Sequence, residues 1–151
     1  MGGDLDNGGL INATPGAGGL SLAGPGNLVR GDLSEVTVAV AGNYTLNGRL
    51  LVGGATTGDL AVAGGSLTFN GFTLETTGLF ATSGSGTIVM QLALDSLIAG
   101  GGAVFQGGNL TGLVTSGTIV SAGDFIQGGT AAAPAFVASG PTIPDTSTAQ
   151  D

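Results

Sequence analysis

A chain of 151 residues with a net charge of −8 excludes several classes of protein at once. Only Arg30 and Arg49 oppose ten carboxylates, whereas nucleic-acid binding needs clustered Lys and Arg that release counterions from phosphates. No apolar run reaches the roughly 20 residues of a membrane-spanning helix. We therefore expect neither a nucleic-acid partner nor membrane insertion.

The chain opens with a Gly-rich segment, residues 1–33, whose short apolar runs are separated by two prolines. Leu10-Ile11 and Leu20-Ser21-Leu22 predict irregular first coils or a cap in this segment. Met1-Gly2-Gly3 lacks the positive charge and the apolar stretch of a signal peptide. The chain is then either intracellular or a piece excised from a larger protein, and we favour the excised piece.

From Ser34 onward, short alternating apolar runs recur, each followed by Gly. Val36-Thr37-Val38-Ala39-Val40-Ala41-Gly42 is the clearest run, and Leu60–Gly65 and Leu67–Gly71 repeat it. Alternation with period two predicts half-buried strands, and helical spacing is absent. The residues predicted to point inward are Val38, Val40, Leu60, Val62, Leu67, Phe69 and Leu74. Those predicted to point outward are Thr37, Thr68, Thr73 and Glu75.

The runs return at a nearly constant spacing along the chain. Val104-Phe105-Gln106-Gly107-Gly108 recurs as Phe125-Ile126-Gln127-Gly128-Gly129, which displaces the Gln by 21 positions. A Gly-Asp-apolar phrase predicts corners at Gly31-Asp32-Leu33, Gly58-Asp59-Leu60 and Gly123-Asp124-Phe125. Short strands with Gly-rich corners that return every ~20 residues are typical of repeat architectures.

We therefore predict an all-β fold, a parallel β-solenoid over residues 34–138, in which stacked coils bury one continuous apolar stripe. Five or so coils at about 4.8 Å each make a rod about 25 Å long. An antiparallel β-sandwich is the alternative, because its strands are equally short and joined by similar turns. Residues 139–151 are rich in Pro, Thr and Ser, and we expect a flexible tail or linker there.

Several phrases between Gly31 and Gly140 resemble one kind of bacterial repeat. They include Gly42–Gly48, Gly58–Leu74, Ser83–Met90 and Phe125–Thr130. These phrases resemble the β-solenoid segments of very large secreted bacterial surface proteins, with filamentous haemagglutinin-like adhesins as looser relatives. The resemblance implies secretion and a structural or adhesive role. It carries over no functional residue, and this chain departs from those proteins in lacking flanking modules.

The residue types needed for most catalysis are missing. The sequence has no His, Cys, Lys or Trp, which removes the usual general base, thiol nucleophile and Schiff-base amine. We predict that the chain is not an enzyme and has no cofactor or catalytic residue. Paired carboxylates, as in glycoside hydrolysis, are the alternative, with Asp59, Glu75 and Asp95 aligned on one face of the solenoid.

Other binding sites have weak sequence support. Asp4-Leu5-Asp6-Asn7-Gly8 places oxygen ligands close together but lacks the spacing of an EF-hand, so no metal site is assigned and calcium near Asp4 and Asp6 stays open. Ice binding favours a Thr-x-Thr motif that is repeated at coil spacing. In this sequence the motif occurs only once, at Thr146-Ser147-Thr148. Sugar binding favours exposed aromatic side chains, and this chain has one Tyr and six Phe.

These observations favour a structural or adhesive module that lies outside a bacterium or on its surface. A phage or secretion-system fibre segment is the alternative, and ice-binding and carbohydrate-binding modules are lesser ones. The expected partners are a further copy of the chain, through the terminal coils, and a host or extracellular-matrix surface. Terminal coils favour self-association because the edge of a sheet is a template for further strands.

Overall fold

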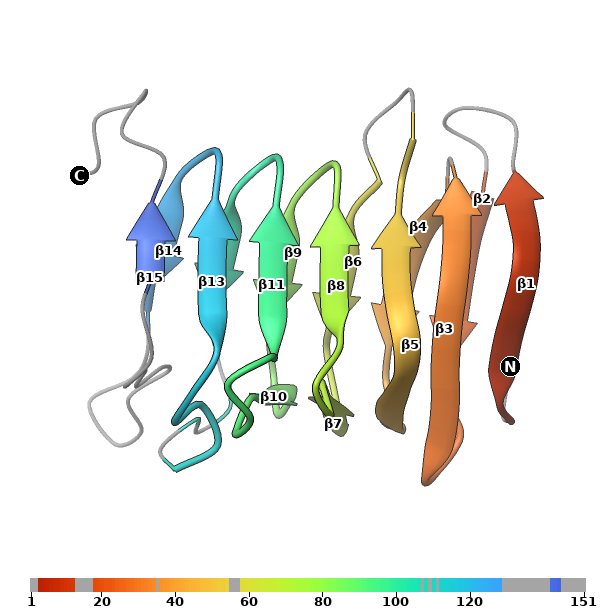
Figure 1. Ribbon diagram of the computed structural model, residues 1–151, viewed down its shortest axis with the longest axis horizontal. Coiled ribbons are helices and arrows are strands. Elements are labelled where there is room, and N and C mark those ends of the chain that lie inside the picture. The colour runs from red at the N-terminus through yellow and green to blue at the C-terminus, as the bar shows by residue number, and fades with distance from the viewer. Residues whose placement is uncertain are drawn as a thin grey trace.

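The computed structural model describes residues 3–12, 18–34, 36–54, 58–106, 108, 110, 112–128 and 142–144. Every regular element in these residues is a β-strand, and every described strand pair is parallel (Figure 1). The chain winds between two sheets as a β-solenoid of about five turns. The predicted fold class is therefore confirmed, and the antiparallel sandwich is excluded.

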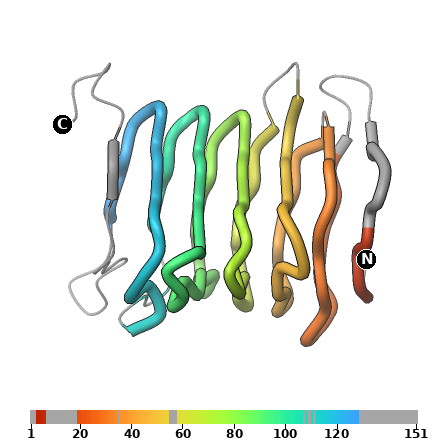
Figure 2. Tube along the Cα trace, viewed as in Figure 1, coloured from red at the N-terminus to blue at the C-terminus, as the bar shows by residue number. Residues whose placement is uncertain are grey.

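The strands alternate between the sheets, and Figure 2 follows the trace from one sheet to the other and back. The first sheet holds β1 (Leu5–Asn12), β3 (Asn27–Ser34), β5 (Asn43–Val52), β8 (Thr73–Thr76), β11 (Ser96–Ala99), β13 (Thr118–Ser121) and β15 (Thr142–Pro144), together with β7 (Ser66–Thr68) and β10 (Thr87–Val89). The second sheet holds β2 (Gly18–Leu22), β4 (Val36–Val40), β6 (Leu60–Val62), β9 (Phe80–Thr82), β12 (Ala103–Phe105) and β14 (Phe125–Gln127).

The core is a set of columns that run from coil to coil between the two sheets. In one column Leu67 pairs with Tyr44 on one side and with Ile88 on the other, and these side chains are at most 1% exposed. Thr68, the next residue, points outward and is only half-buried. The seven residues predicted to point inward are all fully buried, which confirms the predicted faces: Val38, Val40, Leu60, Val62, Leu67, Phe69 and Leu74.

Large and small side chains alternate where the second sheet faces the core. Phe80 pairs with Ala103, which in turn pairs with Phe125. The small side chain of Ala103 leaves room for Phe105, whose ring centroid lies 5.7 Å from that of Phe80 and 5.6 Å from that of Phe125. These tilted ring pairs stabilise the stack beyond their buried area.

The two Gln-Gly-Gly phrases are 21 positions apart in the sequence, but the strands that carry them do not pair at that displacement. Ala103 pairs with Phe125 and Phe105 pairs with Gln127, so Gln106 and Gln127 are not partners. Because side chains alternate between faces, a register that paired the two glutamines would exchange the inward and outward residues of the strand. Burial of the apolar face therefore decides the register, and corners of variable length absorb the difference.

One predicted corner is instead part of a strand. Gly31-Asp32-Leu33 lies inside β3, whereas the other two Gly-Asp phrases stand at the starts of β6 and β14. β3 and β5 are long strands of 8 and 10 residues that bend at Gly31 (φ 124°) and Gly48 (φ 152°). Later coils divide this strand in two, and Asn70 (φ 56°) and Gly71 (φ 84°) form the corner between β7 and β8.

The strands of the N-terminal segment belong to the same two sheets. β1 pairs with β3, and β2 pairs with β4 without a register shift. Leu22, Val29 and Leu33 are fully buried, so the core extends through this segment. At the other end β15 pairs with β13, and the remaining residues from 139 onward lie outside those described.

Thr82 provides a test of the core. Its side chain is 1% exposed, and its buried Oγ1 has no hydrogen-bond partner within the described part of the chain. A buried polar group without a partner destabilises the fold, and Val has nearly the same shape. We expect Thr82→Val to raise the free energy of unfolding by about 1 kcal/mol, measured by urea denaturation.

Thr76→Val is the matched control. Thr76 is equally buried, but its Oγ1 donates a hydrogen bond to the carbonyl oxygen of Gly78 at 3.0 Å. Its replacement removes this bond and should lower stability. Changes of the same sign at both positions would contradict the proposed role of the Thr82 hydroxyl.

Candidate functional site

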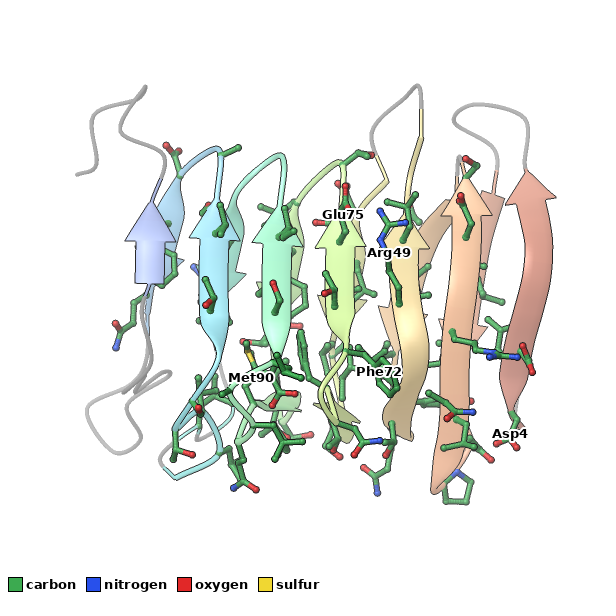
Figure 3. All side chains as sticks on the ribbon, viewed as in Figure 1. Asp4, Arg49, Phe72, Glu75 and Met90 are labelled. Carbon is green, nitrogen blue, oxygen red and sulfur yellow. The ribbon has the colours of Figure 1, made fainter. Side chains whose placement is uncertain are left out.

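The three carboxylates proposed as a catalytic group lie at three separate places. Asp59 precedes β6, and its Oδ1 accepts a hydrogen bond from the backbone N–H of Leu79 at 2.7 Å. Glu75 points outward from β8 and forms an ion pair with Arg49, as Figure 3 shows. Asp95 is buried at a corner before β11. The structure therefore does not bring these residues together on one face, and the glycosidase-like arrangement does not form.

Asp95 accepts three hydrogen bonds from backbone N–H groups of two neighbouring coils. Its side chain is 1% exposed. Its Oδ1 accepts a hydrogen bond from Gly71 N–H at 2.5 Å, and its Oδ2 accepts bonds from Gln91 N–H at 2.7 Å and Leu92 N–H at 2.9 Å. The carboxylate thus joins its own corner to the corner of the preceding coil. Sequence reasoning missed this role, because Gly71 and Asp95 are far apart along the chain.

The corner held by Asp95 projects two leucines from the rod. Leu92 is 50% exposed and Leu94 is 78% exposed. Met90, at the start of the same corner, is fully buried, and Phe72 of the preceding coil packs against the core. Figure 3 places Phe72 and Met90 toward the same end of the strands.

The acidic cluster near the N-terminus is engaged within the protein. Arg30 donates to Asp6 from Nε at 2.6 Å and from Nη2 at 2.8 Å, and Asp4 Oδ1 accepts the N–H of Leu28 at 2.8 Å. The hydrogen bond from Arg30 lowers the pKa of Asp6, and the same bond raises the pKa of Arg30. Among the described residues, no three acidic, His or Cys side chains form a group that could hold a metal ion.

Both arginines connect neighbouring coils on the outer face of the first sheet. Arg30 joins β3 to Asp6 on β1, and Arg49 joins β5 to Glu75 on β8. These side chains are between 31% and 59% exposed, so water and salt screen the attraction and each pair contributes little to stability. The pairs leave this face nearly neutral where they lie.

The described residues do not form a surface suited to ice binding or to sugar binding. Thr87 Oγ1 donates to the carbonyl oxygen of Gly65 at 3.2 Å, and Ser66 Oγ bonds Asn43 Oδ1 at 3.3 Å, so these outward hydroxyls are bound to the protein itself. Thr146-Ser147-Thr148 lies outside the described residues. Four of the described aromatic side chains are at most 1% exposed, which removes them as stacking platforms for sugars: Tyr44, Phe69, Phe80 and Phe105.

Comparison with known proteins adds no relative to this picture. No family model matches the sequence, and no curated protein or solved structure matches it either. None of the described residues form a helix of the length and apolar character needed to cross a membrane. The polar groups described above chiefly hold one coil to the next.

Proposed function

We propose that the chain is a non-catalytic structural module of a bacterial surface or extracellular protein, and that it lengthens a rod by end-to-end stacking. The observation that carries the proposal is the continuity of the stack. Columns such as Tyr44, Leu67 and Ile88 repeat the same inward position from coil to coil. Each coil therefore serves as the template for the next, which is how a repeat protein builds length.

The ends of the described rod support self-association. β1 and β2 are the outermost strands of their sheets at one end, and no described strand lies beyond them. β15 and β14 are the last described strands at the other end. The outer edge of a parallel sheet accepts a further strand in the same register. A second copy of this chain supplies strands of matching spacing and direction.

A fibre segment of a phage or a secretion system is the second candidate. Such fibres commonly join three chains along their apolar stripes, so the stripes of a single chain stay exposed until the trimer forms. Here Leu46, Leu50 and Leu74 are already 0% exposed within one chain. Their burial favours a rod built from single chains over a trimeric fibre.

Sedimentation velocity over a hundredfold concentration range, at low and high salt, tests the proposal. We expect oligomers that lengthen with concentration. Salt should strengthen them because it screens the repulsion between copies that each carry a charge of −8. Electron microscopy of the concentrated sample should show unbranched rods.

Two results would count against stacking. A strictly monomeric profile at every concentration and salt level would reject self-assembly and favour a module capped within a larger protein. A single trimer that does not grow as the protein concentration rises would favour the fibre alternative.

A further inference from the structure

The outer face of the second sheet has an apolar central ladder on its strands from β4 to β14, and the exposed polar residues Thr37, Ser83 and Gln106 stand in the rows beside that ladder. The central ladder runs through Ala39, Ala61, Ala81, Val104 and Ile126. Beside it stand the exposed Ala41, Ala63 and Leu79, the last of which is 38% exposed. Ile126 is 42% exposed. We call this set of side chains the second-sheet face.

The outer face of the first sheet provides an internal comparison. Its outward ladders are built from larger, mostly β-branched or charged residues: Thr45, Thr68 and Val89 in one, and Leu51, Glu75, Ile98 and Val120 in another. Thr, Val and Ile favour strands, whereas Ala is depleted in them. Strand formation therefore does not explain three successive alanines on the second-sheet face, but the close approach of another flat surface does.

Charge restricts what that other surface can be. The second-sheet face has no cation, and its two neighbouring carboxylates, Asp59 and Asp124, lie on one margin, just before β6 and β14. They occupy the same ladder row, separated by Leu79 and Gly102. A basic partner would find only two well-separated charges there. The fitting partner is itself flat, apolar and nearly uncharged.

We propose that the second-sheet face binds the same face of a second copy of this chain, side by side. A two-fold axis parallel to the rod sets the strands of the two copies antiparallel and places their acidic margins on opposite sides. The central ladder then lies along the axis, where Ala39, Ala61 and Ala81 allow the two sheets to approach closely. Such isologous pairing keeps both rods pointing the same way.

The size of the face sets the strength of this contact. The five strands from β4 to β14, with three outward positions each, cover about 24 Å by about 17 Å, or about 400 Å² per copy. Two copies together bury about 800 Å², which is in the range of weak, transient contacts. A pair of single modules therefore associates weakly, and each added coil of a longer rod strengthens the contact.

Cysteine trapping tests the pairing, because the chain has no native Cys. Ala61→Cys lies on the two-fold axis, and we expect mild oxidation to produce a covalent dimer. Thr68→Cys is the matched control: it is equally half-buried but lies on the outer face of the first sheet. The dimer yield for Ala61→Cys should exceed the control yield by at least about tenfold. Equal yields, or no dimer from either variant, would overturn the proposal.

A charge substitution separates this contact from end-to-end stacking. In the cysteine-free chain, Ala61→Lys should abolish the lateral dimer in sedimentation equilibrium, and Thr68→Lys should leave it intact. Neither Lys lies on a terminal strand, so concentration-dependent rods should persist in both variants. A lateral dimer that survives Ala61→Lys would overturn the lateral proposal and leave stacking in place. Loss of rods with retention of the dimer would do the reverse.

Discussion

Leu67→Asp is expected to unfold the chain, whereas Thr68→Asp is expected to change its stability by less than about 1 kcal/mol. Leu67 is fully buried in a column between Tyr44 and Ile88. A carboxylate at this position has no cation to pair with, since Arg30 and Arg49 both lie on the outer face. Burying an unpaired charge costs several kcal/mol, which is comparable to the whole stability of a small domain.

Circular dichroism measures the β-structure of both variants, and urea denaturation measures their free energy of unfolding. Thr68 is the stringent control because it adjoins Leu67 in the same short strand but lies on the opposite face. An Asp there stays in contact with water. Comparable loss of structure in the two variants would mean that the inward and outward faces of β7 are assigned the wrong way round.

Asp95→Ala is expected to lower the free energy of unfolding by about 2–4 kcal/mol. The substitution deprives the N–H groups of Gly71, Gln91 and Leu92 of their common acceptor. A hydrogen bond to a charged group is stronger than one between neutral groups, and a covered donor left without a partner is destabilising. Asp95→Asn keeps one carbonyl oxygen as an acceptor and should fall between the wild type and Asp95→Ala.

Asp124→Ala serves as the control, because Asp124 is exposed and also lies at a corner. Its effect should be within about 0.5 kcal/mol. Hydrogen exchange gives a second, local measurement: the amide of Gly71 should lose protection in Asp95→Ala and keep it in Asp124→Ala. Equal destabilisation by the two alanines would show that Asp95 does not hold the corner.

Much of the fold could be predicted from the sequence because the alternation of side chains along a strand is a local property. Val38, Val40 and Leu60 point inward in the structure, as period two predicts, since side chains of a strand must alternate between faces. The recurrence of the apolar runs at a nearly constant spacing predicted a solenoid correctly for a similar reason. The same coil geometry requires Gly and apolar residues at repeating positions.

The exact register between paired strands could not be predicted from the sequence, because it depends on the length of each corner. Leu60 pairs with Phe80, whereas Leu50 pairs with the more distant Leu74, so coils differ in length along the rod. The repeated Gln-Gly-Gly phrase does not mark partners in the sheet, because Gln127 pairs with Phe105 and not with Gln106. Corners tolerate insertions at little energetic expense, so their motifs are poor guides to the pairing of strands.

The sequence by itself determined the all-β class, the stacking of coils and the side of each strand that is buried, because these follow from local alternation and period. Only the tertiary structure decided which polar groups meet. Asp95 reaches Gly71 and Arg30 reaches Asp6 on neighbouring coils, and the alanines of the second-sheet face align only once the coils are in register. Contacts between coils depend on the sum of all intervening corner lengths, which no single segment of the sequence encodes.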